Sequence, residues 1–210
     1  FRYSTLGILN SLGFHLTGER ESNTFQDVSF NFNFPSKNNR SVFNVWGIGG
    51  LSKEDYSAIK NTADWNEYDD YAIYDFKTNM GAVGIGHSLQ AGKNGLLKTS
   101  VAIMGQRISF VDDTLNTSKT PYTVNDELYN NSRLSFAIYY NTKPGRSISW
   151  KTGGFVSCIG YAFTQSVYDF ATATYRKNII DGKGNTWQWQ PFTQLSWRPV
   201  SNVIINAGLH

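Results

Sequence analysis

The stretch WQWQPFTQLSW, residues 187–197, contains three tryptophans and three glutamines. Successive side chains of a β-strand point to opposite faces. The odd positions of this stretch therefore form an aromatic face with Trp187, Trp189 and Trp197, whereas Gln188 and Gln190 belong to a mostly amide face. This pattern indicates a strand that separates lipid from a wet interior, although a half-buried strand of a soluble protein also alternates in this way.

The composition favours strands and excludes several classes of protein. The 210 residues include 14 Phe, 12 Tyr, 6 Trp and 19 Gly but only 5 Pro, and 17% of them are charged. Aromatic residues are enriched in strands. The net charge of +3, without a Lys/Arg cluster, argues against nucleic acid as a partner. The single cysteine, Cys158, excludes an internal disulfide framework, and no apolar run is long enough for a transmembrane helix.

Alternation predicts about eight strands, separated by connections of two lengths. The strands cover residues 25–34, 41–51, 82–89, 97–106, 133–141, 148–163, 187–197 and 203–209. The short connections are 35–40, 91–95, 143–147 and 198–202, and the long, polar ones are 52–70, 112–130 and 165–186. Within 148–163 the pattern changes phase at Gly153 and Gly154, which predicts a β-bulge there.

The alternation of short and long connections is typical of transmembrane barrels, whose short turns face the periplasm. We therefore predict an all-β fold, an antiparallel transmembrane β-barrel in contact with the lipid of the bacterial outer membrane. Because the sequence begins and ends inside strand patterns, we expect residues 1–210 to be consecutive strands of one larger barrel domain. Two alternatives remain open. One is a small, self-closed eight-stranded outer-membrane barrel with a structural or adhesive role, and the other is a soluble β-barrel that binds a ligand.

The segments FQDVSFNFNFP (25–35) and SVFNVWGIGG (41–50) resemble the barrel of TonB-dependent receptors from Bacteroidetes-type bacteria. They are most similar to receptors that carry a carboxypeptidase-like regulatory domain. YSTLG (3–7), WRP (197–199) and NAGLH (206–210) resemble the same family.

The resemblance implies a barrel of about 22 strands with an N-terminal plug that closes its lumen. It implies active uptake of a nutrient ligand, energised by the TonB complex through the plug. Nothing in these residues corresponds to the plug, and nothing in them identifies the ligand. Some receptors of this kind pair with a surface lipoprotein, which is therefore a further partner to consider.

The sequence predicts neither an enzyme nor a bound cofactor. No nucleophile-elbow, zinc-protease or phosphate-loop motif occurs. The three histidines, His15, His87 and His210, are too far apart to suggest a metal site. The acidic residues of the predicted loops lack the spacing of a calcium-binding loop, so we interpret them as solvated. These acidic residues are Glu67, Asp69, Asp70, Asp112 and Asp113.

Two groups of residues are candidates for contact with a ligand or with a plug. Trp65, Tyr68 and Tyr71 lie in or beside a predicted outer loop, where aromatic rings can stack on a sugar or peptide. Lys98, Gln106 and Arg133 belong to the predicted lumen face, where they can contact a plug or a polar solute. We interpret the other tryptophans as membrane-interface girdles. These are Trp46, Trp150, Trp187, Trp189 and Trp197.

Overall fold

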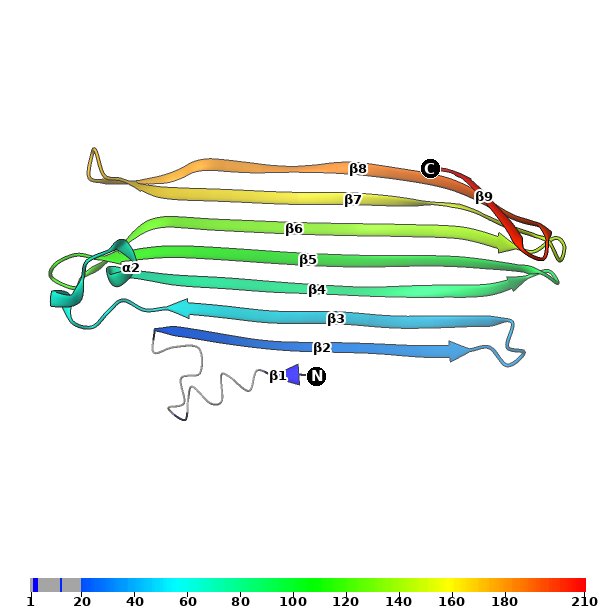
Figure 1. The fold of residues 1–210 in the computed structure, drawn as a ribbon, viewed down its shortest axis with the longest axis horizontal. Helices are drawn as coiled ribbons and strands as arrows, with labels where there is room; N and C mark the ends of the chain where they lie inside the picture. Colours follow the sequence, from blue (N-terminus) through cyan, green and yellow to red (C-terminus); the bar gives the residue numbers. More distant parts are fainter. Residues whose placement is uncertain (1, 4–11, 13–19) are drawn as a thin grey trace.

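The computed structural model describes residues 2–3, 12 and 20–210, which form a single antiparallel sheet (Figure 1). Its strands are β1 (Arg2–Tyr3), β2 (Glu21–Pro35), β3 (Ser41–Tyr56), β4 (Ala72–Ala91), β5 (Gly95–Leu115), β6 (Pro121–Thr142), β7 (Ile148–Asp169), β8 (Thr174–Val200) and β9 (Val203–Leu209). Each strand pairs with the next in sequence, so the chain is a simple meander. His15 and most of the segment 3–7 lie outside the described residues.

The pairing register places the apolar positions of the strands on one face, which we call the apolar face. One row of directly opposite residues on this face consists of Phe30, Gly47, Val83, Ile103, Leu134, Cys158 and Trp187. The opposite face, here called the polar face, carries the intervening residues. The alternation seen in the sequence is therefore continuous across the sheet.

The sheet has almost no buried core. Among the described residues, Ala72 is the only buried hydrophobic one, whereas Phe32 is 57% exposed, Leu134 is 50% exposed and Trp189 is 70% exposed. A continuous exposed apolar face of this kind suits lipid, which offers no hydrogen bonds but accepts apolar side chains. No helix of the described residues is long and apolar enough to cross a membrane.

The two ends of the sheet differ, and we call them the turn end and the loop end. The turn end holds the connections 36–40, 92–94, 143–147 and 201–202, and the loop end holds 57–71, 116–120 and 170–173. Only 57–71 is long, and it contains a short helix, α2 (Tyr68–Tyr71), and a 3-10 turn, η1 (Thr62–Asp64). Figure 1 shows α2 at the end of the sheet opposite to the β8–β9 turn.

Two of the long loops predicted from the sequence are wrong. The predicted loop 112–130 is reduced to 116–120, and 165–186 is reduced to 170–173, because the flanking strands continue. The third, 52–70, is observed as 57–71. Beyond the lipid both faces of a strand meet water, so its apolar alternation ends while its backbone pairing continues. A polar segment therefore reads as a loop although it is a strand.

The bulge predicted at Gly153 and Gly154 is also wrong. β7 pairs through these residues on both sides without a shift in register. The apparent change of phase arises because Phe155 is a large apolar residue on the polar face. Gly153 is required by close packing, since a Cβ atom there would lie 2.5 Å from the Cβ of Tyr139. The register shifts instead at three other places. Two are near the loop end, between Asp112 and Asp113 and between Gln165 and Val167, and one is at the turn end, between Trp197 and Val200.

Trp46 is not a lipid-facing girdle residue, contrary to the prediction. It lies directly opposite Gly84 on the polar face, and its indole covers that glycine, where a Cβ atom would lie 2.6 Å from the ring. Because Gly84 has no side chain, the Trp46 indole can occupy the space above it. The other four tryptophans assigned to girdles lie on the apolar face, and their depth in a membrane stays a prediction.

The two faces give a direct test with neighbouring positions. Val101→Lys places a charge in the middle of the apolar face and is expected to destabilise the folded protein by about 2–4 kcal/mol in a lipid bilayer. Ala102→Lys, the matched control, points to the polar face and is expected to cost little. Urea unfolding of the full-length protein in phospholipid vesicles measures both, and equal losses of stability would contradict the assignment of the faces.

Candidate ligand-binding wall at the loop end

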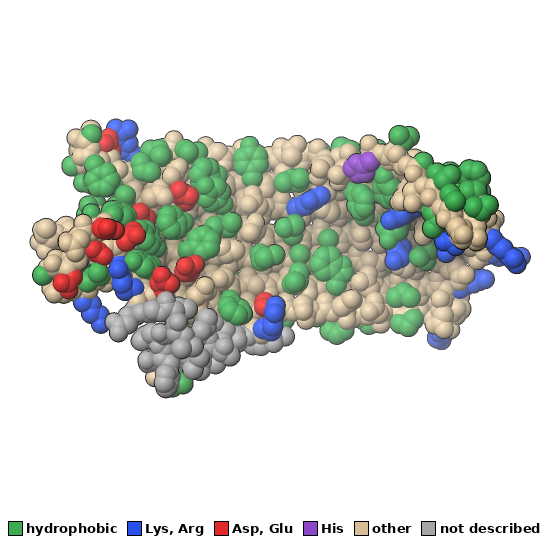
Figure 2. All heavy atoms as spheres, viewed as in Figure 1, with side chains coloured by type: hydrophobic (Ala, Val, Ile, Leu, Met, Phe, Trp, Pro, Cys, Tyr) green, Lys and Arg blue, Asp and Glu red, His purple; other side chains and the backbone are tan. Residues whose placement is uncertain are grey.

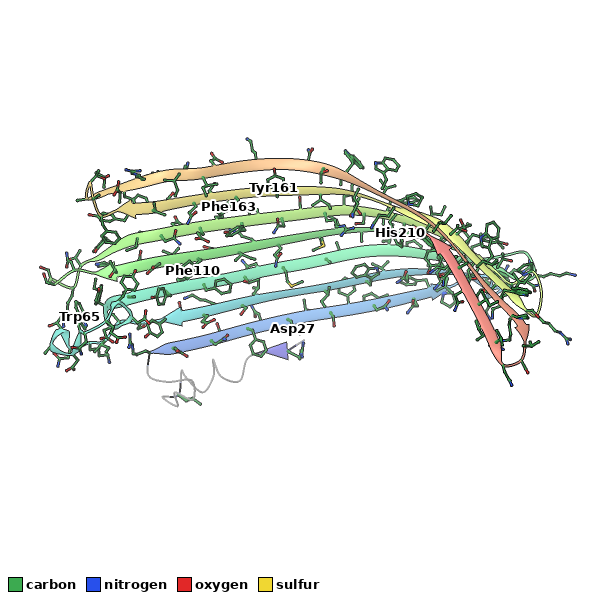
Figure 3. The ribbon with its side chains drawn as sticks, turned by 45° about the horizontal axis from the view of Figure 1, so that its top comes forward. Asp27, Trp65, Phe110, Tyr161, Phe163 and His210 are labelled. Carbon is green, nitrogen blue, oxygen red and sulfur yellow. The ribbon has the colours of Figure 1, made fainter. Side chains whose placement is uncertain are left out.

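The polar face is lined by aromatic rings in its loop-end half. We call this set the aromatic wall, and it consists of Tyr56, Tyr74, Phe76, Phe110, Tyr129, Tyr161 and Phe163. In Figure 3, Phe110 and Phe163 lie between the middle of the sheet and the end that carries Trp65. The wall begins about where the apolar face ends, so its rings lie largely beyond the lipid-facing part of the strands.

The rings of the wall contact one another across strands. The Tyr56 and Tyr74 ring centroids are 5.3 Å apart, and Tyr74 is stacked on Phe110 at 6.0 Å. On the next two strands, Tyr129 and Phe163 are directly opposite and stacked at 4.2 Å, with 15° between their planes. Cross-strand aromatic pairs stabilise a sheet and also present flat apolar surfaces to the solvent side.

Glu127 lies within this wall and is held in place by its neighbours. It is directly opposite Phe110 on one side and Gln165 on the other. Its Oε1 accepts hydrogen bonds from Asn125 Nδ2 at 2.9 Å and from Gln165 Nε2 at 3.0 Å, and its Oε2 accepts one from the Tyr129 hydroxyl at 3.3 Å. The result is a fixed carboxylate beside stacked rings, able to accept further hydrogen bonds from a ligand hydroxyl or amine.

The loop 57–71 brings the predicted residues Trp65, Tyr68 and Tyr71 together. The ring centroids of Trp65 and Tyr71 are 5.6 Å apart, and those of Tyr68 and Tyr71 are 5.5 Å apart. The Trp65 indole donates a hydrogen bond to the Ile59 carbonyl at 2.9 Å, which holds it against its own loop. The structure thus confirms that the three aromatics form one cluster, whereas their contact with a ligand stays a prediction.

Two tyrosine hydroxyls fasten the loop to the wall. Tyr68 donates to Asp112 of β5, with its hydroxyl 2.9 and 3.0 Å from the two carboxylate oxygens. Tyr74 of β4 donates to Asp69 at 2.9 Å. Burial and the hydrogen bond to Asp112 raise the pKa of Tyr68 above its usual value, so the phenol keeps its proton. Asp69 and Asp112, which the sequence places in two separate predicted loops, therefore both accept hydrogen bonds from tyrosines of the same site.

The acidic side chains of the loop have structural partners. Asp70 accepts hydrogen bonds from the backbone amides of Asn66 at 2.8 Å and Glu67 at 3.0 Å. The Arg20 guanidinium lies 3.7 Å from Asp70 and donates to the Asp69 carbonyl. The amides of Asn66 and Glu67, with Arg20 nearby, lower the pKa of Asp70. Within the described part of the chain, no three His, Cys, Asp or Glu side chains are grouped to hold a metal ion.

The predicted lumen residues Lys98, Gln106 and Arg133 share the polar face, but they are not in one cluster. Gln106 and Arg133 lie near its middle, whereas Lys98 is further toward the turn end. Arg133 donates to Ser157 Oγ at 3.0 Å, to Ser135 Oγ at 3.1 Å and to the Gln188 amide oxygen at 3.4 Å. Contact of these three side chains with a plug or a solute stays a prediction.

The sequence reasoning missed the aromatic wall itself. Most of its residues lie where the alternation of apolar residues had faded, so they were assigned to loops or left aside. One signal was available, because Tyr74 and Phe76, and likewise Tyr161 and Phe163, are two residues apart and so share a face of a strand. Their alignment with Phe110 and Tyr129 depends on the register, which the sequence does not supply.

An antiparallel meander with one exposed apolar face and one polar face defines a section of the wall of a transmembrane β-barrel. No protein-family model and no curated protein matches the chain. Two solved structures are similar to it. One is the ferric yersiniabactin uptake receptor FyuA from Yersinia pestis, 8% identical, with a TM-score of 0.63 over 90% of this chain and 28% of that one. The other is the ferric citrate transporter FecA in the unliganded form, 12% identical, with a TM-score of 0.56 over 90% of this chain and 27% of that one.

The chain thus spans just over a quarter of the length of each of these two proteins. At sequence identities of 8% and 12%, the similarity is one of fold alone. The predicted fold class, an antiparallel transmembrane β-barrel represented by part of its wall, is confirmed. The described strands form an open sheet, in which β9 pairs with β8 and β1 pairs with β2.

The hydrogen bond between Tyr68 and Asp112 is testable by a single-atom change. Tyr68→Phe removes the hydroxyl and leaves Asp112 without its partner, so the loop 57–71 should exchange its amide hydrogens faster. Tyr71→Phe is the matched control, because Tyr71 contributes ring contacts to the same cluster. Hydrogen–deuterium exchange of the full-length protein measures both variants, and equal protection in Tyr68→Phe and the wild type would show that the bond does not order the loop.

The lowered pKa of Asp70 gives the loop a pH dependence. A carboxyl whose folded-state pKa is lowered stabilises the folded form at neutral pH, and this stabilisation is lost as the pH falls through that lowered pKa. We therefore expect faster proteolysis within 57–71 at acidic pH than at pH 7. Asp70→Asn should already be cleaved faster at pH 7 and should lose most of the dependence. A wild-type cleavage rate that is flat with pH would contradict this expectation.

Proposed function

We propose that this chain is part of the barrel of a TonB-dependent outer-membrane receptor that actively imports a nutrient, and that the aromatic wall contacts the ligand. The observation that carries the proposal is the aromatic wall on the polar face, at the end of the sheet that holds the longest connection. Support also comes from the similarity in fold to an uptake receptor and to a transporter. The sequence resemblance to TonB-dependent receptors agrees with both.

In this mechanism the chain binds and orients the ligand and performs no covalent chemistry. The ligand enters at the loop end, stacks on rings such as Tyr129 and Phe163, and donates hydrogen bonds to Glu127. A plug domain elsewhere in the full-length protein closes the lumen, and force from the TonB complex moves it. Arg133 and Lys98, further along the polar face, line the route or contact the plug. A surface lipoprotein that covers the loop end is a compatible partner.

The charges of the wall favour an uncharged or cationic ligand over an anionic one. Its charged neighbours on the same face are the carboxylates Glu54, Asp112 and Glu127. Arg20, which lies over the Tyr56 ring at 4.5 Å, is already engaged by the loop. Flat apolar rings beside fixed acceptors suit a ligand that has an apolar face and several hydroxyl or amino groups.

The ligand contact is tested with the full-length protein purified in detergent, by mass spectrometry of any co-purified compound and by titration of that compound. The double variant Tyr129→Ala/Phe163→Ala removes the stacked pair and is expected to weaken binding about tenfold or more. Tyr140→Ala is the matched control, because Tyr140 lies on the apolar face of the same strand. Unchanged affinity in the double variant would remove the aromatic wall from the binding site.

Active import is tested separately in cells that express the full-length protein. Uptake of the same compound should stop when a protonophore or loss of the TonB complex removes the energy source. Uptake that continues would instead indicate passive diffusion through a pore. Heat-modifiable gel mobility and a requirement for detergent are expected of a membrane barrel, and a stable detergent-free monomer would favour the soluble alternative.

A further inference from the structure

The charged residues of the sheet are divided between its two ends. No acidic residue occurs in the segments 28–53, 76–111, 128–168 and 182–210. The acidic side chains of the described strands therefore lie in the loop-end half of the sheet. On the side that it displays, Figure 2 shows Asp and Glu toward the α2 end, and Lys and Arg without Asp or Glu at the opposite end. The turn-end half of the sheet thus has an excess of positive charge.

Lys98 lies in a groove on the polar face that has a volume of about 340 Å³. It is directly opposite Ser88 on β4 and Tyr139 on β6. Further uncharged polar side chains of the same face complete the lining, namely Asn33, Asn44 and Ser100. Because the register places all of these side chains on the polar face, the groove opens on the side that points away from lipid.

A second groove adjoins the first on its turn-end side and has a volume of about 410 Å³. Val42 and Ser88, both on the polar face, line the two grooves together. The cations of the second groove come from three different turns and are Arg40, Lys93 and Lys143. Neighbouring turns are joined, since the Gln90 amide donates to the Arg40 carbonyl at 2.7 Å and the Lys143 amide donates to the Asn94 carbonyl at 3.0 Å. The backbone positions of these cations are therefore fixed relative to one another.

We call Arg40, Lys93, Lys98 and Lys143 the basic patch. None of the four side chains makes an ion pair or a hydrogen bond with another described residue. Cations in other parts of the sheet do have partners: Lys53 is paired with Asp55 at 2.6 Å, and Arg133 donates to Ser157 at 3.0 Å. The charge and the hydrogen-bond donors of the basic patch are therefore not satisfied within this part of the protein.

The basic patch is too wide for one small anion. Lys93 and Lys98 are roughly 15 Å apart along the chain at the start of β5, at about 3.3 Å per residue. Arg40 and Lys143 adjoin β3 and β6, which are separated by roughly 14 Å in the sheet. A partner that neutralises all four cations must carry several anionic groups at comparable distances. Asp and Glu side chains along a polypeptide meet this requirement.

The position of the basic patch excludes two other partners. Lipid covers the opposite face of the sheet, so its headgroups do not reach the grooves. The ligand that the aromatic wall favours is uncharged or cationic, because Glu54, Asp112 and Glu127 lie beside the rings. The basic patch repels a cation and gains nothing from an uncharged molecule. The two halves of the polar face are thus complementary to different partners.

We propose that the turn-end half of the polar face binds an acidic segment of the same full-length polypeptide, with Asp or Glu carboxylates seated at Lys98 and between Arg40, Lys93 and Lys143. This chain covers 28% and 27% of the two similar proteins, so a protein of their length has ample further sequence for such a segment. The inference rests on the proposed function, in which a plug domain fills the lumen, and it specifies the charge of that domain where it meets this wall.

The test is carbodiimide cross-linking of the full-length protein in isolated outer membranes, which joins lysine ammonium groups to carboxylates in direct contact. Peptide mass spectrometry should find Lys98, and at least one of Lys93 and Lys143, linked to Asp or Glu outside residues 1–210. The ion pair of Lys53 with Asp55 supplies an internal control, because its cross-link shows that the reagent has reacted.

A second measurement uses variants and the rate of proteolysis of the cross-linked segment. Lys98→Glu/Lys143→Glu should expose the segment and raise its cleavage rate about tenfold or more. Lys37→Glu/Arg146→Glu is the matched control, because these cations also lie in turns at the turn end but line neither groove. The control variant and the charge-preserving Lys98→Arg/Lys143→Arg should be cleaved at the wild-type rate.

Three results would overturn the proposal. The first is a Lys53–Asp55 cross-link without any carboxylate linked to Lys98, Lys93 or Lys143. The second is a cross-link from these lysines to a different polypeptide, which would make the surface an interface with a separate protein. The third is an unchanged cleavage rate in Lys98→Glu/Lys143→Glu. If that variant does not fold, the cross-links of the wild type decide alone. Loss of uptake or ligand binding with the cross-links present would refute the transport function and leave the acidic partner in place.

Discussion

Lipid offers no hydrogen-bond partner to a peptide group, and this constraint shapes the whole sheet. Every strand that crosses the apolar region must pair along its full length on both sides, which antiparallel neighbours in a meander achieve with short connections. Because strand pairing uses only backbone groups, the side chains of one face can be apolar and contact lipid, and those of the other face can be polar and contact water. The sheet therefore needs almost no buried core, and each of its two faces is in contact with a solvent. One face carries Phe32 and Leu134 toward lipid, and the other carries Arg133 and Glu127 toward water.

The same constraint explains what the sequence can and cannot reveal. Where a strand faces lipid, as at Leu134, alternation is strict and the strand is evident. Where it leaves the lipid, as on β6 from Pro121 to Asn130, neither face must be apolar, so the pattern disappears although the residues belong to a strand. Trp46 was misassigned for a related reason, since its environment is set by Gly84 on another strand. The loop cluster of Trp65, Tyr68 and Tyr71 was predictable because its members are close in sequence.

The aromatic wall was not predictable, because it is created by register. Phe110, Tyr129 and Phe163 are distant in sequence and meet only when β5, β6 and β7 pair with one particular alignment. A slip of one residue would turn an entire strand over and place its rings on the lipid-facing side. The alignment is set in the lipid-facing region, where apolar residues must all point outward. The register shifts of β5, β6 and β7 lie near the loop end, beyond most of the wall, and a third shift, between β8 and β9, lies at the turn end.

The length of the strands has a consequence for how such a protein can change. β5 has 21 residues and, at about 3.3 Å per residue, is roughly 70 Å long, about twice the thickness of a hydrocarbon layer. Its half at the turn end carries the apolar residues that suit lipid, and its half at the loop end carries a ring of the wall that we propose to contact the ligand. The side chains of the two halves therefore meet different requirements, although both halves belong to the same strand. If the aromatic wall binds the ligand as proposed, exchange of the loop-end halves of β5, β6 and β7 as a unit, with the register kept, would change the specificity and leave the lipid-facing halves unaltered.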